Sequence, residues 1–262
     1  MNAQRIKSIA IKVTILVALL PLVACQAKPE QASNRHRWLL GYVAPSIYPV
    51  EINDMNAMDK NGEPMAPIAT QIKAVGRSVQ SVRRIFPHYD SYALPLSVFT
   101  IQAGEQLGGG TVELPDYFEI NWTSLVNLKR YQTRVNITKQ IRDIINQGTL
   151  SAPPDRPSEQ EECHYFVFNF GFLPDGRVKV WLGGCGPFKY VGTITPYKAI
   201  EEKKSAYFSQ EDIDEQKHFS QRATDLGYPD PRYHIPRNKV NKVLHRKYDV
   251  QHKQWQVIEG TH

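Results

Sequence analysis

The segment between Cys163 and Cys185 constrains the fold most, because it has the pattern of a β-hairpin. Phenylalanines at alternate positions lie on one face of a predicted strand. Pro174-Asp175-Gly176 then predicts a tight turn, since proline presets φ and glycine accepts a left-handed conformation. Alternating apolar residues predict the return strand. The alternating residues are Phe166, Phe168, Phe170 and Phe172, then Val178, Val180 and Leu182.

This turn also sets the register of the two cysteines. It pairs even-numbered positions with even-numbered positions, so Cys163 and Cys185 share the opposite face, either directly opposed or diagonal. Directly opposed residues have Cβ atoms about 4.5–5.5 Å apart, which a disulfide can bridge. Whether the bond forms depends on the compartment in which the chain folds.

The first 24 residues have the layout of an export signal. Met1 to Lys12 is basic and has no acidic residue, and Val13 to Ala24 is an apolar run of twelve. Such a run is too short to span a bilayer, which needs about 20 apolar residues. Leu22-Val23-Ala24-Cys25 resembles a bacterial lipobox, which implies cleavage before Cys25 and lipidation of its sulfur and new amino group. An ordinary signal peptide with a chance cysteine is the alternative.

Export places the remaining cysteines in an oxidising compartment, where two cysteines are a candidate disulfide. We therefore expect a bond between Cys163 and Cys185. Gln26 follows Cys25, and by resemblance to sorted lipoproteins a residue other than aspartate implies the outer membrane. The predicted location is the cell envelope, with a lipid anchor in the outer membrane and the protein facing the periplasm.

The predicted fold class is α+β, predominantly antiparallel β-sheet with two to four packed helices. We expect four segments: a signal peptide (1–24), a flexible tether (25–35), a β-rich main domain (36–195) and a C-terminal helical segment packed on it (196–262). The strands are expected at 37–43, 48–57, 92–102, 116–122, 131–137 and 254–258, and in the cysteine-bounded hairpin. The helices are expected at 68–86, 138–147, 209–226 and 238–248, with a glycine-rich loop at 104–110.

Two of these helices are predicted from apolar spacings of three and four residues. In the first, a glycine at position 76 weighs against the helix. The spaced residues are Ile72, Val75, Val79, Val82 and Phe86 in the first, and Val240, Val243, Leu244 and Tyr248 in the second.

The sequence offers no catalytic constellation. It contains no His-Glu-x-x-His, Gly-x-Ser-x-Gly or Walker motif, and its eight histidines have no recognised ligand spacing. Acidic residues between Asp54 and Glu63 allow a calcium site as an alternative to a solvated turn, but their spacing does not match a calcium loop. We expect no enzyme activity, metal, cofactor or small-molecule substrate.

Positive charge is concentrated near the C-terminus. The chain has 32 basic and 26 acidic residues, and loss of three basic residues with the signal leaves a net charge of +3. Residues 232–253 alone carry seven basic residues and one acidic residue. They could face anionic headgroups or an acidic protein partner, or form a solvated helix face. Nucleic acid is not an expected partner of an exported protein. The candidate partner-binding residues are Arg237, Lys239, Lys242, Arg246 and Lys247.

Several motifs resemble a family of bacterial lipoproteins known only as a domain of unknown function. They are Trp38-x-x-Gly41-Tyr42, Tyr48-Pro49, Leu114-Pro115, Trp122-Thr123-Ser124-Leu125, Lys129-x-Tyr131 and Phe172-x-Pro174-x-Gly176-x-Val178-x-Val180-Trp181-Leu182-x-Gly184. The resemblance reaches about Thr193 and brings no catalytic residues. Members are often encoded beside type VI secretion lipase effectors, which implies that some are periplasmic immunity proteins that block a toxic phospholipase.

The expected function is therefore that of a lipid-anchored, periplasm-facing binding protein whose partner is a lipase effector. A structural or envelope-maintenance lipoprotein that binds an envelope component is the alternative. The tryptophans of the strand-like segments, Trp38, Trp122 and Trp181, are expected to pack in the core rather than to form a ligand cage.

Overall fold

The computed structural model describes residues 35–36, 38–96, 101–102, 112–151, 159–200, 209–249 and 251–262. Residues Ala32–His262 form one compact unit. The predicted signal peptide, Cys25, most of the predicted tether and the glycine-rich segment 104–110 lie outside the described residues. Among the described helices, none is long and apolar enough to cross a bilayer.

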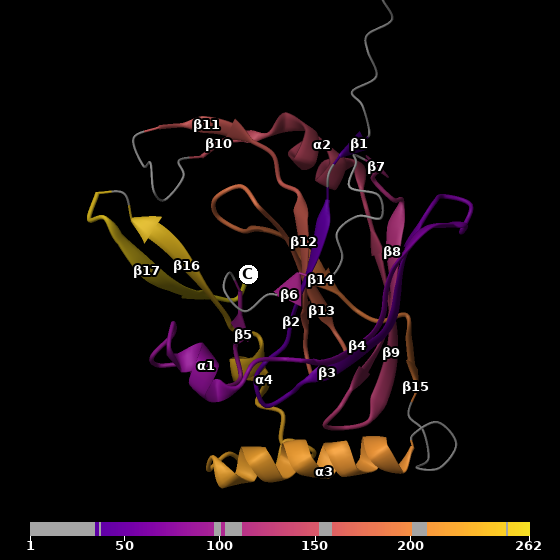
Figure 1. Ribbon diagram of the computed structural model, residues 1–262, viewed down its shortest axis with the longest axis vertical. Coiled ribbons are helices and arrows are strands. Elements are labelled where there is room, and N and C mark those ends of the chain that lie inside the picture. Colours follow the sequence, from indigo (N-terminus) through magenta and orange to yellow (C-terminus); the bar gives the residue numbers. More distant parts are fainter. Residues whose placement is uncertain are drawn as a thin grey trace, which may run out of the picture. The chain divides into compact units, whose positions relative to one another are not determined.

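Two five-stranded sheets form the centre of this unit (Figure 1). The first has the order β14-β13-β12-β2-β6 and the second the order β15-β9-β8-β3-β4. All neighbouring strands in these two sheets are antiparallel except β2 and β12. The first sheet comprises β2 (Leu39–Val43), β6 (Ile101–Gln102), β12 (Val167–Phe172), β13 (Val178–Gly183) and β14 (Lys189–Ile194). The second comprises β3 (Val50–Met58), β4 (Pro64–Val75), β8 (Tyr117–Ser124), β9 (Lys129–Asn136) and β15 (Lys198–Ile200).

An aromatic seam joins the two sheets. The ring of Phe118 in β8 lies edge-on to Phe168 and Phe170 of β12, with centroid distances of 5.1 and 5.6 Å. Trp122, also in β8, meets Phe172 at 5.0 Å. All five rings are fully buried. Edge-to-face pairs stabilise a core beyond the area that they bury, so this seam fixes the stacking of the sheets as well as excluding water.

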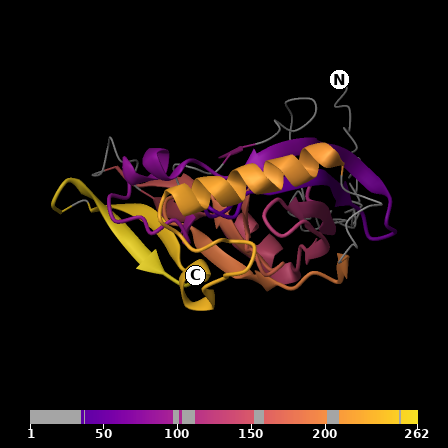
Figure 2. The ribbon, with the colours of Figure 1, turned by 90° about the horizontal axis from the view of Figure 1, so that it is seen from below.

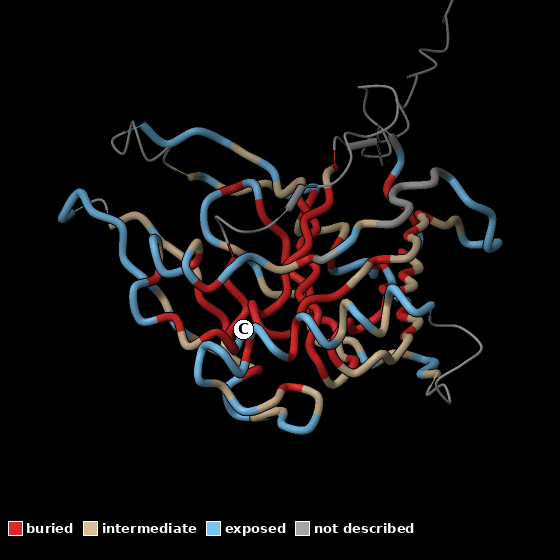
Figure 3. Tube along the Cα trace, turned by 60° about the horizontal axis from the view of Figure 1, so that its bottom comes forward, coloured by how far each residue is buried: buried red, intermediate tan, exposed pale blue. Residues whose placement is uncertain are grey.

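The predicted hairpin is confirmed, with the expected register. Phe172 pairs with Val178, and even positions continue to face even positions along both strands. The side chains of both strands are buried, because the second sheet covers one face and the C-terminal segment contacts the other. Figure 3 shows this concentration of buried residues in the central strands.

The two predicted capped helices are also confirmed. In α2 (Lys139–Gln147), the side chain of Thr138 accepts a hydrogen bond from the backbone N–H of Ile141, and Gly148 follows with φ +65°. In α3 (Gln210–Asp225), Ser209 and Asp212 form a reciprocal capping box. This α3 lies across the end of the sheets (Figures 1 and 2), where its apolar side chains pack on residues of the turns before β3 and after β8.

The predicted helix over 68–86 is wrong. Most of its first half belongs to the long strand β4, and only α1 (Val79–Arg83) is helical. A β-bulge explains the misleading spacing: Val75 and Ile72 are three residues apart, yet they pair with Val50 and Ile52, which are two apart. The bulge places one extra residue in β4. Apolar residues of β4 that have the three-residue spacing of a helix can therefore pair with buried residues of β3 that have the two-residue spacing of a strand.

The predicted helix over 238–248 is wrong as well. Only α4 (Arg237–Val240) is helical, and β16 (Val243–Asp249) then pairs with β17 (Gln254–Gly260), the predicted last strand. Val243 packs in a cluster with Trp181, and Leu244 packs in another cluster with residues of α1. Adjacent residues of a strand point to opposite faces, so two consecutive buried apolar residues indicate a strand covered on both sides.

The third sheet has the order β17-β16-β5, in which β5 (Leu94–Pro95) runs parallel to β16. The predicted strand over 92–102 is therefore divided, since β5 and β6 belong to different sheets. Two small pairs complete the described strands: β1 (Arg35–His36) with β7 (Val112–Glu113), and β10 (Thr149–Ser151) with β11 (Glu161–Cys163). With four described helices and mostly antiparallel sheets, the α+β class is confirmed.

Gly176 gives a test of the packing at the central turn. Its φ is +95°, and an added Cβ would overlap the ring of Tyr131. Gly227 has a similar φ of +79° but open space around it. We expect Gly176→Ala to lower the free energy of unfolding by about 1–3 kcal/mol more than Gly227→Ala, the usual range for overpacking. Urea unfolding of both variants measures the difference, and equal losses would contradict the predicted overlap.

Candidate functional site

The disulfide between Cys163 and Cys185 is confirmed, with the two Cα atoms 5.7 Å apart. Cys163 ends β11, and Cys185 lies just after β13 and is buried. The bond therefore joins the small β10–β11 pair to the end of the central hairpin. Cys163 itself is outside the phenylalanine-bearing strand, which begins at Val167.

The three tryptophans expected in the core are all buried there. Trp122 donates its indole hydrogen to Thr133 Oγ1 at 3.2 Å, and Trp38 donates its own to the carbonyl of Glu113 at 3.4 Å. These hydrogen bonds satisfy the polar ends of Trp38 and Trp122, whereas Trp181 Nε1 is buried without a hydrogen-bond partner among the described residues.

The structure does not bring the five candidate basic residues onto one face. Arg237 and Lys239 are exposed on α4, whereas Lys242 forms an ion pair with Glu259, with 2.5 Å between Nζ and Oε1. Arg246 and Lys247 are adjacent in β16 and so point to opposite faces of that strand. The predicted basic patch is therefore divided between α4 and the β16–β17 hairpin.

Lys179 is a buried charge that sequence reasoning missed. Only 3% of it is exposed, and its ammonium donates hydrogen bonds to the carbonyls of Asn241, at 2.7 Å, and Thr261. Burial and the nearby Arg177 lower the pKa of Lys179 to about 8, while Asp175 acts in the opposite direction. Lys179 alternates with valines in β13, a pattern typical of a solvent-facing lysine. The C-terminal segment covers that face and is held there by this side chain.

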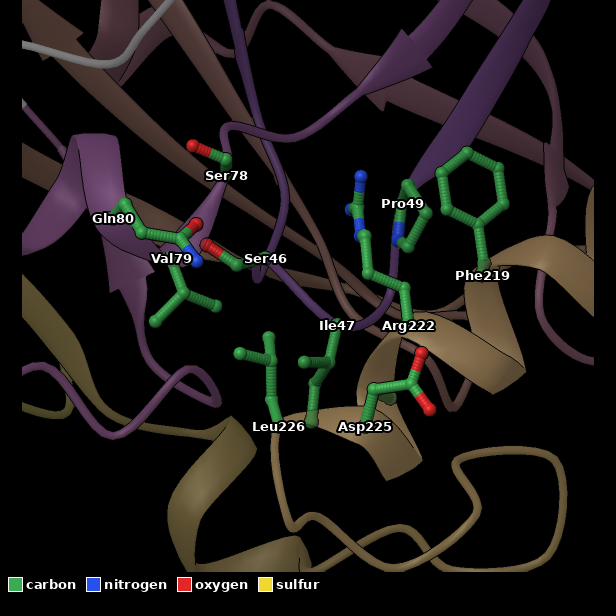
Figure 4. A pocket seen from close by; sticks show the side chains of 11 residues that line it. Ser46, Ile47, Pro49, Ser78, Val79, Gln80, Phe219, Arg222, Asp225 and Leu226 are labelled. Carbon is green, nitrogen blue, oxygen red and sulfur yellow. The ribbon is translucent and has the colours of Figure 1, made fainter.

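A small hollow lies between the loop after β2, the start of α1 and the second half of α3 (Figure 4). Its volume is about 140 Å³, and its apolar wall includes Ile47, Val79 and Leu226. Ser46 Oγ is buried at this hollow and has no hydrogen-bond partner among the described residues. Because ligand pockets usually have about 300–1,000 Å³, this hollow suits a single side chain better than a small-molecule substrate.

A second, more polar hollow of about 340 Å³ lies beside α3. Lys217 and Ser220 of α3 line it together with Asp230 and Arg232 of the following loop. Arg232 is engaged by Asp230, with 2.6 Å between Nη2 and Oδ2, and this hydrogen bond lowers the pKa of the Asp230 carboxyl. Asp230 and Arg232 are therefore paired with each other, and Lys217 is paired with Asp214, which is not part of the wall.

Acidic and histidine side chains do not gather in the described part of the chain: it holds no group of three or more His, Cys, Asp or Glu side chains placed to bind a metal. Asp59, within the segment considered for calcium, accepts hydrogen bonds from the backbone of Asn61 and Glu63, each at 2.8 Å. These bonds lower the pKa of the Asp59 carboxyl and stabilise the turn between β3 and β4.

Residues 25–231 match the model of a family described as protein of unknown function (DUF2931). The chain belongs to this family. No curated protein and no solved structure matches the sequence or fold of this chain. The DUF2931 match begins at Cys25 and ends before α4, so it includes both sheets of the core and α3 but not the β16–β17 hairpin.

The loop at the end of the DUF2931 match carries the most exposed aromatic residue of the described chain. Tyr233 is 83% exposed, and the guanidinium of Arg232 lies 5.3 Å from the centroid of its ring. Leu226, in the same connection between α3 and α4, is also exposed. Tyrosine and arginine are enriched at the centres of protein interfaces, so this connection is a candidate contact surface.

Reduction of the disulfide should destabilise the protein measurably. A bond across 22 residues of sequence contributes about 3 kcal/mol in the chain-entropy model. We therefore expect dithiothreitol to lower the free energy of urea unfolding by about that amount. The double variant Cys163→Ala/Cys185→Ala is the control and should not respond to dithiothreitol. Equal responses of the two proteins would contradict a structural role for the bond.

Lys179 should make stability depend on pH in the alkaline range. Below pH 8 both states are protonated, and the folded state bears the full cost of the buried charge. Between pH 8 and 10.5 the folded state binds fewer protons than the unfolded state, so the contribution of Lys179 to stability rises with pH. Unfolding in urea at pH 7 and 10 should show wild type gaining stability relative to Lys179→Met.

The matched control for that experiment is Lys189→Met, which removes an exposed lysine of the neighbouring strand. Its difference from wild type should stay constant over the same range. A constant difference for Lys179→Met as well would show that the folded-state pKa of this lysine is not lowered.

Proposed function

We propose that this protein is a lipid-anchored, periplasm-facing binding protein that acts as an immunity protein against a secreted phospholipase. The disulfide is the observation that carries the export part of the proposal. Disulfides persist in oxidising compartments such as the periplasm and are rare in the cytosol. Together with the lipobox-like segment ending at Cys25, the Cys163–Cys185 bond supports an exported chain.

The start of the family match supports an anchor at Cys25. The match begins at this residue, which is the predicted N-terminus of the mature protein. Nine residues separate Cys25 from the start of β1, and a segment of that length spans at most about 30 Å. Three acyl chains on Cys25 would hold the protein stably at the membrane, whereas one chain gives only marginal binding. The toxin's lipid substrate would then lie within reach of its inhibitor.

We place the partner contact on the connection between α3 and α4. Tyr233 and Leu226 offer exposed apolar area, and Arg237 and Lys239 offer exposed positive charge on the adjoining helix. Buried aromatic anchors surrounded by charged residues supply most of the binding energy in protein interfaces. A partner surface with acidic residues around an apolar centre would be complementary to it.

The test begins by asking whether a phospholipase effector is encoded beside this gene, and that effector is then co-expressed with the protein in the periplasm. We expect wild type to restore growth, and Tyr233→Ala/Arg237→Glu to lose most of the protection because both the aromatic anchor and the positive charge are removed. Leu150→Ala, which alters an exposed apolar residue outside this surface, should protect as wild type does. Immunoblots of each variant control for expression.

Two outcomes would overturn parts of this proposal. If cells die equally with and without the wild-type protein, the immunity function is wrong, and an envelope-maintenance role becomes the better hypothesis. If Cys25→Ala protects as well as wild type, the lipid anchor is not needed for protection.

A further inference from the structure

We infer that the β16–β17 hairpin is a second membrane-contact site, which lays Trp255, Tyr248 and Val257 on an anionic phospholipid surface beside its basic residues. A membrane-contact site is a property additional to the proposed immunity function. The inference depends on the proposed lipid anchor only for the identity of the membrane.

Trp255 is exposed in a chain that otherwise buries its tryptophans. It is 47% exposed, whereas Trp38, Trp122 and Trp181 are each at most 5% exposed. Exposure of a tryptophan ring to water is unfavourable. Tryptophan is enriched at membrane interfaces, where the apolar part of the ring contacts lipid and its N–H group contacts water. Trp255 therefore has the exposure and chemistry of an interfacial anchor.

The neighbours of Trp255 extend this surface along one face of the hairpin. Tyr248 is its cross-strand partner, with ring centroids 5.4 Å apart in an edge-on arrangement. Val257, 49% exposed, pairs with Arg246, whose guanidinium lies 4.4 Å from the centroid of the Trp255 ring. Paired residues share a face of a two-stranded sheet, so these side chains form one amphipathic surface.

The same face is buried at the base of the hairpin and exposed towards its end. Leu244 packs in a cluster with residues of α1, while residues 251–257 are all exposed. Figures 1 and 3 show the hairpin extending from the sheets with its outer part exposed. The fold thus fixes the base firmly and presents the aromatic part to the surroundings.

The charge of this outer part favours an anionic surface. Between residues 245 and 257 there are three basic residues, Arg246, Lys247 and Lys253, and one acidic residue, Asp249. Lys247 and Asp249 point to the face of β16 opposite to that of Arg246 and Tyr248. Asp249 is itself paired with His252, with 2.8 Å between Oδ2 and Nδ1. Each basic residue near an anionic bilayer contributes about 1 kcal/mol of attraction. Aromatic area and positive charge together are typical of segments that lie in the interface.

Charge also distinguishes a lipid surface from a second copy of this chain. A second copy of the hairpin would bring like charges together. The hairpin lies beyond the family match, so membership of the family does not by itself predict this contact.

The experiment uses the mature chain, residues 25–262, with Cys25→Ala so that no acyl chain contributes. Sedimentation with vesicles of phosphatidylethanolamine and phosphatidylglycerol measures binding, and vesicles of phosphatidylcholine alone provide the neutral comparison. We expect binding to the anionic vesicles with a blue shift of tryptophan emission, which Trp255 would produce as the exposed tryptophan. Trp255→Ala should weaken binding on the order of tenfold, equivalent to about 1.4 kcal/mol.

Two further variants separate aromatic and electrostatic contributions. Lys253→Glu should weaken binding to anionic vesicles at low salt, and the effect should shrink at high salt because salt screens exposed charges. Tyr233→Ala is the matched control, since it removes a still more exposed aromatic residue from outside the hairpin. It should bind vesicles as the parent does.

The inference is overturned if the parent chain does not sediment with anionic vesicles, or if Trp255→Ala and Tyr233→Ala reduce binding equally. Equal binding to neutral and anionic vesicles would overturn the electrostatic part. Dimerisation that depends on Trp255, without vesicle binding, would identify a second copy as the occupant instead. None of these results depends on protection against a toxin, so this inference and the proposed immunity function can fail separately.

Discussion

The contact of Phe118 and Trp122 with the phenylalanines of β12 is the constraint on which the rest of the structure depends. These rings come from both sheets and form the centre of the largest core cluster. Their edge-on geometry requires the sheets to stack in one relative position, since a shift along either strand would separate the pairs. Strands β8 and β12 then determine the positions of their neighbours through hydrogen bonding. The outer elements, α3 and the third sheet, pack against a base that is already fixed.

The sequence predicted the parts of this core in which local chemistry and tertiary packing agree. The Pro-Asp-Gly turn, the alternating phenylalanines and the caps at Thr138 and Ser209 are local signals, and the corresponding elements formed as expected. The predictions of secondary structure failed where tertiary contacts gave a strand the apolar spacing that is typical of a helix. The bulge in β4 produced helical spacing in a strand, and burial of β16 on both faces produced consecutive apolar residues. Neither effect is visible without the partner strands.

The surface was less predictable than the core, for a related reason. Whether a side chain is buried depends on what covers it, and this is decided by segments distant in sequence. Lys179 alternates as a solvent-facing residue would, yet the C-terminal segment covers it. Trp255 has a large apolar side chain of the kind usually found in a core, yet it is exposed. The five basic residues, considered as one patch because they are close in sequence, lie on different elements once α4 and β16 are formed.

The parallel pairing of β2 with β12 has a consequence for biogenesis. Leu39 lies beside Val167, and the intervening chain includes most of the second sheet. A topology dominated by such distant pairings has a high contact order and folds slowly. If the chain is exported as proposed, β2 emerges well before β12 and has no parallel partner strand until β12 follows. During that interval the edge of β2 would be open to capture by a chaperone that binds extended strands.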